Sequence, residues 1–147
     1  MSTFILHALP AGEVDTDAPV TVRKTAADRE PCRRCLRDAE PGERLALTAY
    51  DPFLVRSPYA GDGPVFVHAD GCERFPSEPG VVSEQVSRRI LSVRAYDADA
   101  MLTDATVLEG EQFRERAEAL LADPGVEFLH VHFAGPGCFA FRIDRAA

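Results

Sequence analysis

The chain has 147 residues, of which 46% are hydrophobic and 27% charged, and its formal net charge is -8 at pH 7. This length is typical of a single domain with one core, here residues 1–147, and the composition excludes intrinsic disorder. The acidic balance argues against general nucleic-acid binding, which depends on basic surfaces.

Most of the predicted elements are β-strands. Apolar and alternating runs, separated by segments rich in proline and glycine, predict strands at residues 3–9, 20–24, 44–50, 65–69, 90–96, 105–108, 128–133 and 138–143. A short helix is expected at residues 83–89. Hairpins are easier to recognise than βαβ units, so we expect an α+β fold: a largely antiparallel sheet with a few packed helices and long loops.

The clearest helix signal runs from residue 111 to residue 122. Phe113, Ala117, Leu120 and Leu121 are spaced at i, i+4, i+7 and i+8, which places them on one face of a helix. Asp-Pro-Gly at residues 123–125 is expected to end it.

The last two strands are expected to form a hairpin. Their apolar faces coincide when Phe133 pairs with Phe139, Val131 with Phe141, and Leu129 with Ile143. This register requires a three-residue loop, 135–137, with Gly137 at a positive φ. It also places His130 across from Arg142, His132 across from Ala140, and Cys138 diagonal to His132.

The four cysteines indicate metal or thiol chemistry. No apolar run approaches the roughly 20 residues that span a bilayer, and the start of the chain lacks the features of a signal peptide. We therefore expect a cytoplasmic protein that does not insert into membranes. Cysteines in the reducing cytosol are more often ligands or free thiols than disulfides.

Cys32, Cys35, His68 and Cys72 have the spacing of two short metal-binding segments, Cys-x-x-Cys and His-x-x-x-Cys. Three thiolates and an imidazole are a typical ligand set for a structural zinc ion, which four protein ligands coordinate completely. Two alternatives remain open. The cysteines and the histidine are buried packing residues, or Cys-x-x-Cys is a redox motif, although the βαβ context of that motif is absent.

A second candidate site lies on the hairpin. His130, His132, Cys138 and Arg142 share one face in the expected register, and they can form a thiol nucleophile with an imidazole base and an anion-binding arginine. His130 and His132 can also hold a catalytic metal if a third ligand comes from elsewhere. The alternative is that the histidines face solvent or a loop and that Cys138 only packs. The sequence contains no phosphate-binding glycine loop, no Gly-x-Ser-x-Gly elbow and no His-Glu-x-x-His motif.

The motifs at residues 31–33, 36–44, 58–60, 63–67, 94–97 and 137–139 resemble those of the bacterial domain of unknown function family 1203. The resemblance covers nearly the whole chain. It implies no established reaction and no catalytic residues.

The sequence thus favours a small binding domain with a structural zinc site, acting on an unknown ligand or protein partner. The alternative is a small enzyme that uses the Cys, His and Arg residues of the hairpin. Residues 23–37 contain six basic and two acidic residues, which form either a small-anion site or a solvated loop.

Overall fold

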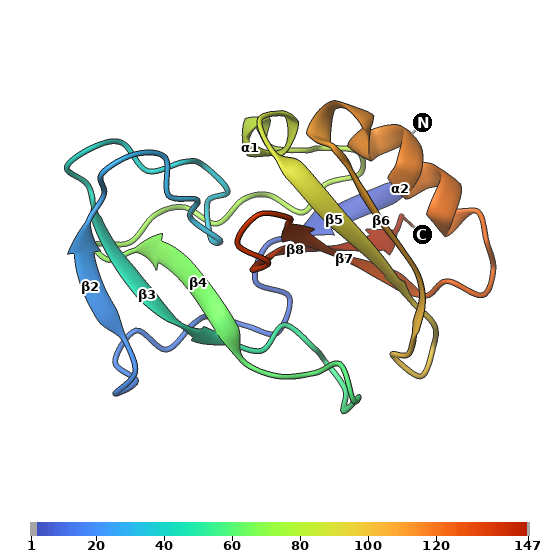
Figure 1. Ribbon diagram of the computed structural model, residues 1–147, viewed down its shortest axis with the longest axis horizontal. Helices are drawn as coiled ribbons and strands as arrows, with labels where there is room; N and C mark the ends of the chain where they lie inside the picture. The colour runs from blue at the N-terminus through green and yellow to red at the C-terminus, as the bar shows by residue number, and fades with distance from the viewer. Residues whose placement is uncertain (1–2, 147) are drawn as a thin grey trace.

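The protein consists of two antiparallel β-sheets and two short helices (Figure 1). The computed structural model describes residues 3–146. The larger sheet has the strand order β1 (Phe4–His7), β8 (Phe139–Arg145), β7 (Phe128–Phe133), β5 (Ile90–Tyr96) and β6 (Leu102–Glu109). The smaller sheet has the order β2 (Val22–Thr25), β3 (Arg44–Tyr50) and β4 (Gly63–His68).

The helices are α1 (Glu84–Ser87) and α2 (Phe113–Leu121), the latter preceded by a single 3-10 turn, Gly110–Gln112. The largely antiparallel arrangement is confirmed, but the chain is richer in β-structure than an α+β fold with a few helices. Strands β3, β5 and β7 begin and end at the expected residues. No helix within residues 3–146 has the length and apolar character needed to cross a membrane.

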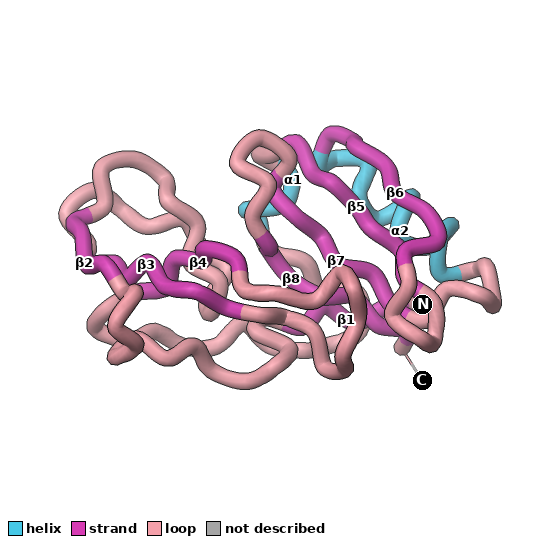
Figure 2. The backbone as a smooth tube through the Cα atoms, turned by 60° about the horizontal axis from the view of Figure 1, so that its bottom comes forward, coloured by secondary structure: helices cyan, strands magenta, loops and turns pink. Residues whose placement is uncertain are grey.

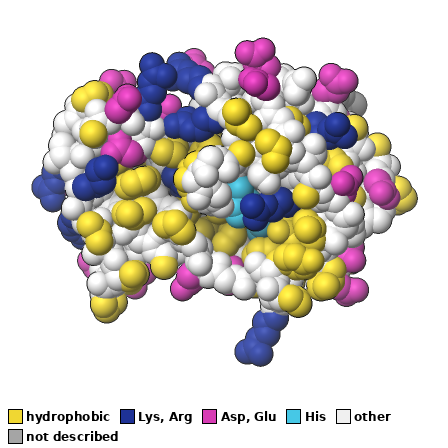
Figure 3. Space-filling view, viewed as in Figure 1, with side chains coloured by type: hydrophobic (Ala, Val, Ile, Leu, Met, Phe, Trp, Pro, Cys, Tyr) yellow, Lys and Arg dark blue, Asp and Glu magenta, His cyan; other side chains and the backbone are white. Residues whose placement is uncertain are grey.

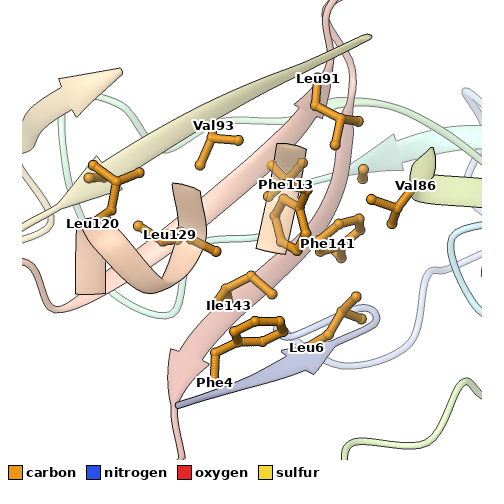
Figure 4. Close-up of a cluster of buried hydrophobic side chains, with 14 of the residues drawn as sticks. Phe4, Leu6, Val86, Leu91, Val93, Phe113, Leu120, Leu129, Phe141 and Ile143 are labelled. Carbon is orange, nitrogen blue, oxygen red and sulfur yellow. The ribbon is translucent and has the colours of Figure 1, made fainter. Parts of the chain in front are cut away.

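The main core lies between α2 and one face of the larger sheet (Figure 4). Phe113, Ala117, Leu120 and Leu121 are all buried, as the helical spacing predicts. The ring of Phe113 packs edge-on against Phe4 and Phe141, with centroid separations of 5.9 and 5.6 Å. Burying such a phenylalanine contributes on the order of 2 to 3 kcal/mol of hydrophobic free energy, so this contact helps hold α2 against the sheet.

A β-bulge in β8 makes the hairpin register differ from the expected one. Val131 pairs with Phe141 as expected, but His132 pairs with Phe139, so Ala140 is the extra residue in β8. The expected pairings of Phe133 with Phe139 and of His132 with Ala140 were therefore wrong. The bulge moves Phe139 to the sheet face opposite α2, where it packs in a separate cluster with Tyr50 of β3.

The smaller sheet lies beside the larger one, on the side away from α2 (Figures 1 and 2). Two groups of contacts join the sheets. Leu9, Tyr50, Val65 and Phe139 form an apolar cluster between them. Arg33, from the loop between β2 and β3, reaches β8 and donates from Nε to the carbonyl oxygen of Phe139 at 2.7 Å.

Candidate functional site

Residues 32–35, here called the knuckle, form a tight turn packed against β4. Cys32 makes an isolated parallel bridge with Phe66, and the Arg33 amide donates to the Phe66 carbonyl at 2.9 Å. The Leu36 amide donates back to the Cys32 carbonyl at 3.1 Å. Leu36 has a φ of 55°, in the left-handed region that favours glycine, and its buried side chain anchors the turn in the main core.

The knuckle meets the end of β4, so that Cys32, Cys35, His68 and Cys72 come together. Their ligand atoms all lie within 4.8 Å of one another. The Sγ atoms of Cys32 and Cys72 are 3.7 Å apart, and Sγ of Cys35 is 3.5 Å from Nδ1 of His68. All four predicted ligands are thus close enough together to be compatible with a metal site.

His68 presents Nδ1 to the cysteines because its other ring nitrogen is occupied. Nε2 lies 3.2 Å from Oε1 of Glu43 and 3.4 Å from Nη2 of Arg37; the Glu43 oxygen is nearer and only accepts, so we assign the proton to Nε2. Arg37 in turn donates to both oxygens of Glu43 at 3.3 Å. Nδ1 is therefore unprotonated in the neutral ring, as a metal ligand must be.

The thiols of the cluster do not ionise independently. A hydrogen bond from Cys35 lowers the pKa of Cys32 to about 4. The same hydrogen bond raises the pKa of Cys35, and burial raises that of Cys72. Without a metal the cluster favours a single thiolate, because a second negative sulfur would be repelled by the first. A bound divalent cation would stabilise all three thiolates.

The arginines of the knuckle have separate roles. Arg34 donates from Nε to the Cys72 carbonyl at 2.7 Å and forms an ion pair with Glu13. Arg33 points away from the cluster and is only 1% exposed. None of the ion pairs among residues 3–146 includes Arg33, and its Nη2 donates to Sγ of Cys138 at 2.8 Å. The knuckle is thus coupled directly to the hairpin.

The four hairpin residues do not form one connected group: His130, His132 and Arg142 lie on the sheet face opposite α2, whereas Cys138 precedes β8 and packs against the edge of the main core. His130 pairs with Arg142 as expected and is fully buried, and neither of its ring nitrogens has a hydrogen-bond partner. Burial lowers the pKa of His130 to about 3. Arg142 donates to both oxygens of Asp144 at 2.9 Å. Within residues 3–146, no hydrogen bond joins Cys138 to a histidine.

His132 instead contacts Arg94, a residue of β5. Nδ1 of His132 donates to the Gly137 carbonyl at 2.9 Å, which leaves Nε2 as an acceptor for Nη1 of Arg94 at 3.4 Å. Burial lowers the pKa of His132 to about 4, so the ring is neutral near pH 7. Gly137 has a φ of 80°, as the hairpin loop was expected to require.

A cleft of about 160 Å³ opens between the sheets above these residues, here called the inter-sheet cleft. Its lining includes the rings of Tyr50, Phe53, Tyr59 and Tyr96, together with Arg94, His132, Cys138 and Phe139. The space-filling view shows histidine at the centre of this face, beside a basic side chain and bordered by hydrophobic groups (Figure 3).

Glu43 was not predicted as part of these sites. The contacts of Arg33 with the hairpin and of Arg94 with His132 were not predicted either. Glu43 lies two residues before Leu45, which pairs with His68, so the register of β3 and β4 could have located it. Arg94 pairs with His130 across β5 and β7. The contacts of Arg33 with Phe139 and Cys138 had no local signal, because both residues are more than 100 positions away along the chain.

A family model described as "Protein of unknown function (DUF1203)" matches residues 29–145. The match includes all four residues of the Cys and His cluster and the entire hairpin. No curated protein and no solved structure matches the chain.

Proposed function

The chain belongs to the DUF1203 family, and we propose that it is a small binding domain stabilised by a zinc ion at Cys32, Cys35, His68 and Cys72. Thiolate and imidazole ligands are characteristic of zinc sites. Four protein ligands complete a tetrahedral shell and leave no position for water or substrate. The proposed role of the ion is therefore structural.

The spacing of the ligand atoms is the observation that carries this proposal. With Zn–S bonds of about 2.3 Å and Zn–N bonds of about 2.0 Å, a regular tetrahedron has S–S edges of about 3.8 Å and S–N edges of about 3.5 Å. The separations of 3.7 Å between Cys32 and Cys72 and of 3.5 Å between Cys35 and His68 agree with these values. Two of the six ligand–ligand separations thus match a tetrahedral zinc site, and all six lie within 4.8 Å.

The ion would add a direct link between three segments that already contact one another. The knuckle and Cys72 lie in loops, whereas His68 ends β4. Holding the knuckle against β4 also positions Arg33, whose side chain crosses to β8. Zinc would thereby stabilise both the smaller sheet and its attachment to the larger one.

Elemental analysis of purified protein tests the proposal. We expect about one equivalent of zinc per chain, in keeping with one four-ligand site. The double variant Cys32→Ser, Cys35→Ser should lose the metal, whereas Cys138→Ser, a matched control outside the cluster, should retain it. Replacement by cobalt should give the visible absorption of a tetrahedral thiolate site. Metal-free protein that is as stable as zinc-supplemented protein would contradict the proposal.

A second candidate function, thiol chemistry at Cys138, is supported by its contact with Arg33. A guanidinium group beside a sulfur stabilises the reactive thiolate. Cys138 is partly exposed and lines the inter-sheet cleft. His130 is buried too deeply to act as its base. Thiol chemistry at Cys138 would therefore rely on Arg33 to activate the sulfur, and not on a histidine base.

Alkylation kinetics test this second candidate. Zinc-loaded protein should react with iodoacetamide at Cys138 faster than free cysteine does at pH 7. Arg33→Lys, which keeps a positive charge, should retain more of this reactivity than Arg33→Met. Labelling that is slow and equal in the wild type and in both Arg33 variants would exclude thiol chemistry at Cys138.

A further inference from the structure

The inter-sheet cleft has the size of a site for one small ring. Its volume is about 160 Å³, and a protein cavity of roughly 150 Å³ accommodates one benzene molecule. Aromatic side chains form its walls. All three tyrosines of the chain lie among them, and the chain has no tryptophan.

The walls are arranged for contact with another aromatic ring. Tyr96 packs edge-on against Phe53 and Tyr59, with centroid separations of 5.3 and 5.7 Å. Aromatic rings favour such edge-to-face contacts with one another. A flat ring in the cleft can extend this arrangement.

Arg94 supplies a positive charge that forms no ion pair with a carboxylate within residues 3–146. Its Nε donates to Oγ of Ser92 at 3.2 Å and its Nη1 to His132 at 3.4 Å. These two contacts orient the guanidinium group. Burial raises the pKa of Tyr96, and the adjacent Arg94 opposes that shift, so the guanidinium also faces the Tyr96 hydroxyl in the cleft. Arg142, on the same sheet face, differs because Asp144 pairs with it.

The two histidines near Arg94 neither add to its positive charge nor cancel it. His130 and His132 are neutral near pH 7, because burial lowers the pKa of each. Among the described residues that line the cleft, the only carboxylate is that of Asp62, which is exposed and forms no ion pair with Arg94. An anion in the cleft would therefore meet an unpaired, preorientated guanidinium group.

We propose that the inter-sheet cleft binds a small aromatic carboxylate of the size of benzoate. Its carboxylate accepts hydrogen bonds from Arg94, and its ring lies between Phe53, Tyr59 and Tyr96. This inference deepens the proposed binding role and rests on it, but it does not depend on the identity of the metal.

Fluorine NMR with 4-fluorobenzoate tests the inference on full-length, zinc-loaded protein. We expect a saturable change in the fluorine signal. The neutral analogue 4-fluorobenzamide should bind at least about 10-fold more weakly, because it cannot form a charge-assisted pair with Arg94. Equal binding of the two compounds, or no binding by either, would overturn the proposal.

Two substitutions locate the site. Arg94→Met should weaken 4-fluorobenzoate binding at least about 10-fold. Arg116→Met, on the exposed face of α2, should leave it unchanged. Equal binding by both variants would place the ligand elsewhere and reject this cleft.

Zinc content measured on the same samples separates the two proposals. Zinc-loaded protein that fails to bind 4-fluorobenzoate would overturn the ligand site alone. Protein that binds the ligand without containing zinc would overturn the metal site alone.

Discussion

Glu43 accepts a hydrogen bond from Nε2 of His68 at 3.2 Å, on the side of the ring opposite the Nδ1 atom that faces Cys35. Glu43 is itself held, since Arg37 donates to both of its oxygens and the Glu40 amide donates at 2.6 Å. The hydrogen bond from Arg37 is the main cause that lowers the pKa of Glu43 to about 2. A permanent carboxylate therefore fixes the orientation of the His68 ring.

Replacing Glu43 by glutamine should weaken zinc binding without abolishing it. Carboxylates that orient a ligand histidine typically contribute 10- to 100-fold to metal affinity, and we expect a loss in about that range. Competition with a chromophoric chelator measures it. Glu40→Gln is the matched control, because Glu40 contributes only its backbone amide to this network. Equal affinities in the two variants would show that the Glu43 carboxylate has no part in metal binding.

Removing zinc should lower the free energy of unfolding. A ligand present at about 1,000 times its dissociation constant stabilises the native state by about 4 kcal/mol. Urea unfolding with and without a strong chelator measures the difference. The Cys138→Ser variant should respond to the chelator as the wild type does. An unchanged unfolding midpoint in the chelated wild type would contradict a structural metal.

The stability of the protein should fall as the pH decreases below 6.5, partly because of His130. Burial, with a further contribution from Arg142, lowers its pKa in the folded protein to about 3, from an ordinary value of 6.5. Below pH 6.5 the unfolded chain takes up a proton that the folded protein does not. The stability due to neutral His130 is complete above pH 6.5 and is lost as the pH falls toward 3. Between pH 6.5 and 4 the loss is roughly 3 kcal/mol.

His130→Phe isolates this contribution. The variant should show a smaller loss of unfolding free energy between pH 6.5 and 4 in urea titrations. At pH 7 it should be as stable as the wild type or more so, because the substitution removes two buried nitrogens that lack partners. A pH dependence identical to that of the wild type would assign the loss to other groups.

Gly110 should not tolerate a side chain. A Cβ atom there would lie 1.7 Å from the carbonyl oxygen of Val86, where α1 meets the turn before α2. Because that atom belongs to the backbone, Gly110→Ala should cost about 3 kcal/mol. Gly135→Ala is the control, since a Cβ atom at Gly135 meets nothing within 4 Å. Thermal unfolding compares the two, and equal melting temperatures would show that α1 moves aside freely.

Local periodicity in the sequence determined the elements and the faces that they bury. The spacing of Phe113 and Ala117 predicted the buried face of α2, because side chains four residues apart in a helix share a face. Alternation of apolar and polar residues located β3, β5 and β7, because side chains two residues apart in a strand share a face. The four Cys and His residues were recognisable because metal-binding segments have short internal spacings that survive in the sequence.

The tertiary structure alone decided which distant groups meet. The bulge at Ala140 breaks the alternation on which the hairpin register depended, so Phe139 lies on the face opposite the one expected. Arg33 and Cys138 are 105 positions apart, and their contact follows from how the two sheets pack. Periodicity describes only the direction of a side chain from its own strand or helix. The partners of Arg33 and the cleft at Arg94 depend on the relative placement of the two sheets.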